Sequence, residues 1–216
     1  MNKLMLTAVA AAVAFSVAVP AQAAALLGVK AGVDVWAANA KVNSTTNDKS
    51  DDTSPSFYVA FEHFIPLVPN FRLRYNDIDT GAVAFEQTDL TAYYEILDND
   101  AIAFDLGLTM TKFGSGNVTL GGQNDTFDEW QPSIYGNVEV GIPMTPLFVF
   151  GDLNFSSFNS NSTVDGQAGV KWSIPLVALD LNVRGGYRVM DYDFDSVKNS
   201  DSVKLDGWFA GVELDF

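Results

Sequence analysis

The sequence predicts an all-β fold, an antiparallel transmembrane up-and-down β-barrel of ten strands, with eight strands as the alternative. Three observations support this prediction. The chain begins with an export signal, apolar and polar residues then alternate along most of its length, and short turns alternate with long polar loops. Strict alternation indicates strands whose two faces meet different solvents, as the strands of a membrane barrel do.

Residues 1–23 have the layout of a secretory signal peptide. Lys3 precedes an apolar run that reaches Val19, and the small-residue triplet at 21–23 ends with Ala23, after which we expect cleavage. The run is shorter than the about 20 residues that a membrane-spanning helix needs. Residues 24–216 contain no obvious linker, and we expect them to form one barrel domain.

In the first five predicted strands every second residue is apolar. The predicted strands lie near residues 27–37, 55–64, 70–78, 88–97 and 101–112. Their apolar sets are, in order, Val29, Ala31, Val33 and Val35; Phe57, Val59 and Phe61; Phe71, Leu73 and Tyr75; Leu90, Ala92, Tyr94 and Ile96; and Ile102, Phe104, Leu106, Leu108 and Met110.

Five further strands are predicted near residues 129–142, 147–156, 163–172, 179–190 and 205–216. Their apolar sets are Ile134, Val138, Val140 and Ile142; Leu147, Val149, Leu153 and Phe155; and the alternating runs from Val164 to Trp172, Leu179 to Val189 and Leu205 to Phe216. The number of strands falls to eight if the run near 84–97 or the run near 163–172 is not a full span.

The connections between these strands alternate in length. Short connections near residues 66–70, 98–100, 143–146 and 173–176 alternate with longer polar ones at 38–54, 79–87, 114–128, 157–162 and 191–204. Short turns on one side and long loops on the other are typical of outer-membrane barrels, whose short turns are periplasmic. An even number of strands then places both termini on the periplasmic side.

A soluble β-sandwich or lipocalin-like barrel also alternates, but it has no need of aromatic residues on its apolar face. Here the aromatic residues of the apolar parity gather near strand ends, as in the two girdles of a membrane barrel. They are Phe57, Phe71, Tyr75, Tyr94, Trp130, Phe155, Trp172, Tyr187, Trp208 and Phe216. The pattern therefore favours the outer membrane of a Gram-negative bacterium.

The last strand resembles the C-terminal assembly signal of outer-membrane barrels, carried by Trp208, Val212, Leu214 and Phe216. This resemblance implies recognition by the barrel-assembly machinery. The stretches 93–98, 104–108 and 184–188 resemble a family of small proteobacterial outer-membrane β-barrels with a Gly-Gly signature near the C-terminus, here Gly185-Gly186. That family implies no catalytic residue.

Composition narrows the partners. The chain has no Cys, which excludes disulfides and thiolate metal sites, and we expect no cofactor. Its net charge of −15 becomes −16 once Lys3 is removed, which argues against nucleic acid. Outer-membrane lipids and lipopolysaccharide are the expected partners.

Acidic loops raise the question of divalent cations. The loop acids are Asp48, Asp51, Asp52, Asp125, Asp128, Asp191, Asp193, Asp195 and Asp201. The spacing Asp191-x-Asp193-x-Asp195 lacks the Gly and the distal Glu of an EF-hand, so we predict solvated loops with weak divalent binding and no defined metal site.

The polar parity predicts a charged lumen with twelve acids and six bases. The acids are Asp34, Glu62, Asp89, Glu95, Asp105, Glu139, Asp152, Asp165, Asp180, Asp206, Glu213 and Asp215, and the bases are Lys30, Arg72, Arg74, Lys171, Arg184 and Arg188. Adjacent strands suggest four groupings: Arg72 and Arg74 with Glu62 and Glu95, Lys171 with Asp180, Arg188 with Asp206, and Lys30 with Glu213.

Two function classes follow. One is a structural barrel or a narrow, poorly conducting, cation-preferring pore, because about eight strands are already filled by side chains whereas 16 to 18 leave an open channel. Bulky residues of the inward parity, such as Trp36 and Tyr58, add to the obstruction. The alternative is a barrel enzyme acting on lipid A or peptides, but the single His63 falls at a predicted periplasmic turn, so we predict no catalytic residues.

Overall fold

The computed structural model describes residues 27–42, 45–47, 53–80, 83–99, 101–120, 123–158, 161–193 and 203–216. The predicted leader, residues 1–23, and the predicted new terminus Ala24 lie outside this range. So do several loop acids, Asp48, Asp51, Asp52, Asp195 and Asp201. Within the described ranges, no helix is long and apolar enough to cross a membrane.

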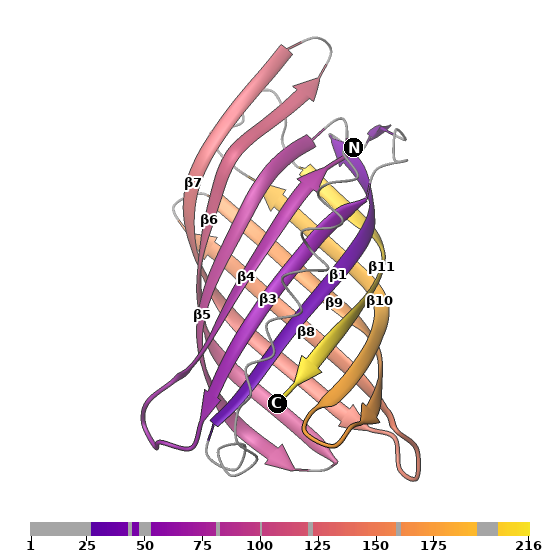
Figure 1. The fold of residues 1–216 in the computed structure, drawn as a ribbon. Helices are drawn as coiled ribbons and strands as arrows, with labels where there is room; N and C mark the ends of the chain where they lie inside the picture. Colours follow the sequence, from indigo (N-terminus) through magenta and orange to yellow (C-terminus); the bar gives the residue numbers. More distant parts are fainter. Residues whose placement is uncertain are drawn as a thin grey trace.

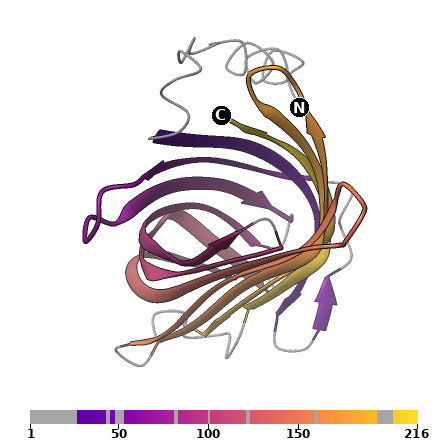
Figure 2. The same ribbon diagram turned by 90° about the horizontal axis from the view of Figure 1, so that it is seen from below.

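The chain forms a closed, ten-stranded antiparallel barrel, as predicted (Figures 1 and 2). Consecutive barrel strands are neighbours, and β11 pairs with β1 to close the sheet, while the short β2 (Thr45–Asn47) pairs antiparallel with the end of β1. The ten barrel strands are β1 (Leu27–Val42), β3 (Ser54–His63), β4 (Asn70–Asp79), β5 (Val83–Asn99), β6 (Ile102–Leu120), β7 (Gln123–Gly141), β8 (Leu147–Phe158), β9 (Asn161–Pro175), β10 (Asp180–Asp193) and β11 (Val203–Asp215).

Several segments predicted to be loops are strand. β6 and β7 each have 19 residues and project beyond the other strands (Figure 1). The segments 79–87 and 114–128 therefore belong largely to β-ladders. Alternation read with the apolar residues facing outward misses 79–87, because beyond the membrane the outer face meets water and apolar side chains such as Val83 and Phe85 face inward.

The apolar parity faces outward. Leu73, Leu90, Leu108 and Ile134 are between 47% and 68% exposed, whereas polar neighbours such as Arg74 are buried in the lumen. An exterior of this kind cannot be hydrated favourably over a whole barrel and is suited to lipid. The wall therefore has the polarity of a membrane barrel, not that of a soluble one.

The polarity of the wall reverses toward the long-loop end. There the inward side chains form an apolar cluster: Trp36, Ala38, Ala40, Ile78, Val83, Phe85, Phe113, Met190, Tyr192, Val203, Leu205 and Phe209. Outward positions at the same level carry charge, including Asp77, Glu86 and Lys204. This end of the barrel is built like a small soluble barrel with a hydrophobic core.

Two short turns are type II turns with Pro at the second position. In the β3–β4 turn the N–H of Val68 donates to Ile65 O, and in the β7–β8 turn the N–H of Thr145 donates to Ile142 O. The third residues, Leu67 and Met144, have φ angles of 67° and 66°. A type II turn requires positive φ at this position, where Gly is strongly preferred.

Candidate functional site

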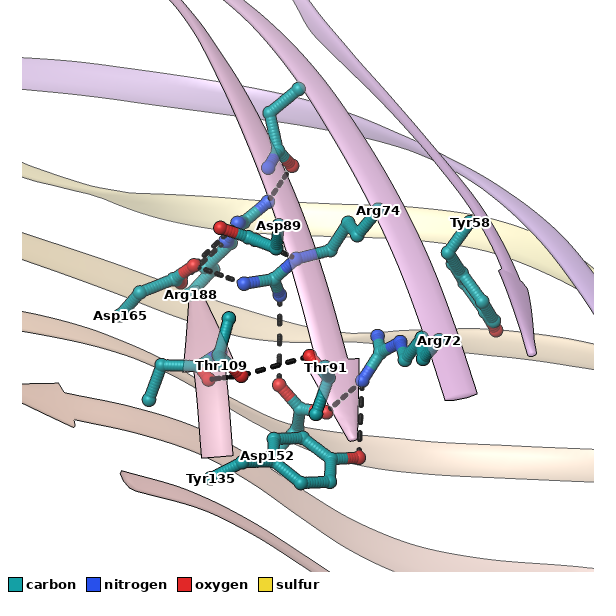
Figure 3. Close-up of polar contacts among 12 residues, drawn as sticks. Tyr58, Arg72, Arg74, Asp89, Thr91, Thr109, Tyr135, Asp152, Asp165 and Arg188 are labelled. Atoms are coloured by element: carbon teal, nitrogen blue, oxygen red, sulfur yellow. Dashed lines mark hydrogen bonds and ion pairs between the residues drawn. The ribbon is translucent and has the colours of Figure 1, made fainter. Parts of the chain in front are cut away.

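Four arginines, two on β4 and two on β10, fill the middle of the lumen. Arg74 is the centre of this network (Figure 3). Its Nε donates to Asp89 Oδ2 on the adjacent β5 at 2.8 Å, and its Nη2 donates to Asp165 Oδ2 on β9 at 2.5 Å. Its Nη1 also lies 3.6 Å from Asp152 Oδ1. Because β9 is not a neighbour of β4 in the sheet, the bond to Asp165 crosses the lumen.

Arg72, two residues before Arg74 on the same face of β4, makes a second bond across the lumen. Its Nη1 donates to Asp152 Oδ2 on β8 at 2.5 Å and to the Tyr135 hydroxyl on β7 at 3.2 Å. The guanidinium also lies over the ring of Tyr58, 4.8 Å from its centroid. Buried charges are tolerated where they are paired and hydrogen-bonded in this way.

Arg188, on β10, binds Asp165, the acid that Arg74 also binds. Its Nε and Nη2 donate to Asp165 at 3.0 and 2.9 Å, and its Nη1 donates across the lumen to Asn76 at 2.9 Å. The carboxylate of Asp165 therefore receives two guanidinium groups, from Arg74 and Arg188. Arg188 also stacks over Trp36, at the boundary with the apolar cluster.

Arg184 organises a third group around Tyr58. Its Nη1 donates to the Tyr58 hydroxyl at 2.7 Å, and that hydroxyl donates to Glu213 Oε2 at 2.5 Å. Arg184 Nε lies 3.1 Å from Asp34 Oδ1, and the guanidinium stacks on Phe150. Aromatic faces stabilise a cation here in addition to its acidic partners.

Toward the short-turn end the lumen is wetter. Lys30 donates to Glu62, which also accepts from the Tyr93 hydroxyl, both at 2.8 Å, and Lys171 pairs with Glu139. A cavity of about 290 Å³ opens at this mouth, and its lining includes Asp98, Asp180 and Asp215. Deeper in, a cavity of only about 50 Å³ adjoins Asp105 and Arg72.

The predicted charge pairs differ from those observed. Arg72 and Arg74 bind Asp152, Asp89 and Asp165, and not Glu62 or Glu95. Glu62 binds Lys30, which had been expected beside Glu213. The expectation allowed the arginines partners on adjacent strands alone, but a long guanidinium also reaches acids across a barrel of this width, as Arg72 reaches Asp152 and Arg74 reaches Asp165.

Two predicted lumen residues lie elsewhere. Asp206 faces outward, because its parity is that of Trp208, and it accepts hydrogen bonds from Lys41 at 2.8 Å and from Tyr187. Glu95 has the inward parity but is exposed at the rim, next to a bulge between Glu95 and Leu97. Lys171 and Asp180 both line the mouth, where Lys171 forms ion pairs with Glu139 and, at 3.8 Å, with Glu213.

The key acids of the network were visible in the sequence only as members of the inward parity. Asp34, Asp89, Asp152 and Asp165 are each at most 5% exposed. Parity placed them in the lumen, but no local signal distinguished them from rim acids such as Asp215. Their position in the middle of a strand, at the level of an arginine, is the feature that separates them from acids at the rim.

The Gly-Gly pair permits a close approach of strands. Gly186 lies opposite Gly169 of β9, and a Cβ on Gly186 would overlap the carbonyl oxygen of Ala168. Gly thus acts here through the absence of a side chain, as is common inside strands.

The predicted assembly signal forms the closing seam. Trp208 and Val212 are exposed on the outer face of β11, while Leu214 and Phe216 are partly buried. The N–H of Phe216 donates to Val29 O at 2.9 Å, and the N–H of Val29 donates to Phe216 O at 3.2 Å. These bonds complete the junction between the first and last strands.

His63 and the acidic side chains are the described residues to consider for catalytic or metal chemistry. Neither ring nitrogen of His63 has a hydrogen-bond partner there, and its ring packs edge-on against Phe61. In the same ranges no group of three or more His, Asp or Glu side chains is arranged to hold a metal ion. A general base would need a hydrogen-bonded partner to orient it.

No family model matches the chain, and no curated protein matches it. Among solved structures it is similar to Neisserial surface protein A (18% identity, TM-score 0.40, covering 88% of this chain and 97% of the other). It is also similar to the β domain of the Bordetella autotransporter BrkA (11%, 0.44, 88% and 99%) and to the outer membrane protease OmpT from Escherichia coli (7%, 0.44, 88% and 96%). At these values the alignments carry no functional assignment.

Proposed function

We propose that this protein is an integral outer-membrane barrel whose lumen is closed, so that its role is structural and not that of an open pore. The location is supported by the outward apolar wall together with the export signal in the sequence. Short turns at the end where β1 begins and β11 ends support periplasmic termini.

The observation that carries the closed lumen is the pair of crossings from β4. Arg72 to Asp152 and Arg74 to Asp165, both at 2.5 Å, join opposite walls of the barrel. The aromatic rings of Phe85, Phe113 and Tyr192 form a second layer toward the long-loop end, with centroids 5.2 to 6.0 Å apart. An ion would have to displace both a paired charge layer and a packed apolar layer.

A narrow cation-preferring pore is the second candidate. The acids at the short-turn mouth, among them Asp98, Asp180 and Asp215, would attract cations into the vestibule at that end. The deeper space narrows sharply beyond them. We therefore propose that cations enter the vestibule without crossing the barrel.

Planar-bilayer recording of the refolded full-length mature protein tests this proposal. We expect no single-channel steps from the wild-type barrel in concentrated KCl. A variant with Arg72→Ala, Arg74→Ala, Phe85→Ala and Phe113→Ala opens both layers and serves as the conducting control. Stable, cation-selective steps from the wild-type protein would overturn the closed lumen and favour the pore.

A further inference from the structure

The wall of the barrel is incomplete between β7 and β8. Their ladder ends at the pair Ile134 and Phe155, although β7 extends back to Gln123 and β8 continues to Phe158. The next pair in this register would be Ser133 with Ser156, and then Pro132 with Ser157. Neither pair forms.

Pro132 provides the physical reason. The Ser156 hydroxyl donates to Pro132 O, so this carbonyl points toward β8. In a strand the N–H and C=O of one residue point to the same side, so the N–H that proline lacks is the one that would have bonded to β8. Proline within a sheet is confined to positions of this kind.

A notch follows from the missing ladder. A cavity of about 400 Å³ lies between β6, β7 and β8, with a size typical of sites for small molecules. Its walls carry the outward side chains of Leu108, Met110, Ile134 and Phe155. The notch is therefore an apolar recess in the outer surface of the barrel.

The floor of the notch is closed toward the lumen. Gln131 Nε2 donates to Ser156 Oγ, and the Thr109 hydroxyl donates to Asn154 Oδ1, both at 2.7 Å. Thr109 is also bonded to Thr91 at 2.8 Å. These bonds separate the notch from the charged lumen, so a ligand would enter it from the side of the membrane.

The surroundings of the notch identify its occupant. Its outward residues continue the apolar wall, and Trp130 and Lys112 lie just beyond it on β7 and β6, with Lys112 Nζ 5.4 Å from the Trp130 ring centroid. A Trp with a Lys is typical of the membrane interface. The notch thus lies immediately inside that interface, where lipid chains begin.

We propose that the β7–β8 notch binds one fatty acyl chain of a membrane lipid. The inference rests on the membrane location proposed above. Continuity with the lipid-facing wall supports this occupant over a protein partner, and the closed floor supports binding without passage into the lumen.

Native mass spectrometry of the barrel tests the proposal. The full-length mature protein is refolded into vesicles of dioleoylphosphatidylglycerol and dioleoylphosphatidylcholine, and retained phospholipid is counted after transfer to detergent. Pro132→Val restores the missing N–H, and Ile134→Trp fills the mouth of the notch. Ala168→Trp is the control, because Ala168 is an exposed position of β9 with intact ladders to β8 and β10.

We expect one retained lipid in the wild-type protein and in Ala168→Trp. In the two notch variants retention should fall about tenfold, as when about two buried methylene groups are lost. Equal retention in all four proteins would overturn the proposal, and so would a wild-type dimer without lipid, which would assign the notch to a second copy. Flotation of the vesicles tests the membrane location separately. If the barrel floats with the vesicles but the notch variants retain as much lipid as the wild-type protein, lipid binding at the notch is refuted and the membrane location is not.

Discussion

Replacing Asp165 with Asn should strongly destabilise the barrel, because this carboxylate is the shared partner of two buried guanidiniums. It accepts from Arg74 at 2.5 Å and from Arg188 at 2.9 and 3.0 Å. The Asp165 side chain is only 4% exposed. Asparagine has nearly the same shape, so the substitution removes charge without creating a cavity.

The expected loss in the free energy of unfolding depends on which ion pairs each arginine retains after the substitution. Breaking a buried ion pair typically costs about 3–5 kcal/mol. Arg74 keeps its bond to Asp89 at 2.8 Å, whereas Arg188 forms an ion pair with Asp165 and with no other acid among the described residues. We therefore expect a loss of about 3 kcal/mol in the free energy of unfolding, most of it from Arg188.

Urea unfolding of the refolded protein, followed by tryptophan fluorescence, measures this loss. Asp206→Asn is the matched control, because its partner Lys41 has a side chain that is 39% exposed and such pairs contribute about 0–1 kcal/mol. If Asp165→Asn unfolds within about 0.5 kcal/mol of the wild-type protein, the network does not stabilise the lumen and our reasoning about buried pairs fails.

Three further changes have defined outcomes. Phe216→Ser should reduce assembly into the outer membrane without yielding a soluble folded form, because an open seam leaves backbone groups unsatisfied in lipid; normal heat-modifiable, membrane-inserted protein would refute this. Met144→Gly should raise the free energy of unfolding by about 0.5–1 kcal/mol in the same urea assay by relieving positive φ, and a decrease would contradict the turn assignment. Tyr58→Phe should cost about 1–3 kcal/mol by removing the hydroxyl between Arg184 and Glu213, and an unchanged unfolding midpoint would show that this hydroxyl is dispensable.

Alternation was sufficient to predict the barrel and most of its strands. A strand in contact with lipid on one face must keep one parity, so residues such as Val33 and Leu73 report the fold directly. The same logic placed Arg72, Arg74 and Asp165 in the lumen. It could not assign partners, since the distance across a closed sheet depends on shear and tilt, which no local pattern encodes.

The parity prediction failed where the solvent changes. In β11, Leu205 faces inward and Asp206 outward, the reverse of the pattern expected from a membrane strand. Neither residue breaks the period of two; only the meaning of the two faces changes along the strand. A reading that assigns every charged residue of the strand to the lumen therefore misplaces Asp206, whereas its position relative to Trp208 places it correctly on the outer face.

This reversal indicates that the lumen is closed by different kinds of side chain in the two halves of the barrel. Charged residues such as Asp77 and Glu86 would be costly on a wall that faces hydrocarbon, so the level at which they appear marks where the wall meets water. On the short-turn side of that level the apolar residues are needed on the outer face, and the interior is filled by paired charges. On the long-loop side the interior can be apolar, and Phe85 and Phe113 fill it. Because the two layers depend on different forces, disrupting the arginine layer alone should destabilise the barrel without opening it, and both layers must be removed before ions can pass.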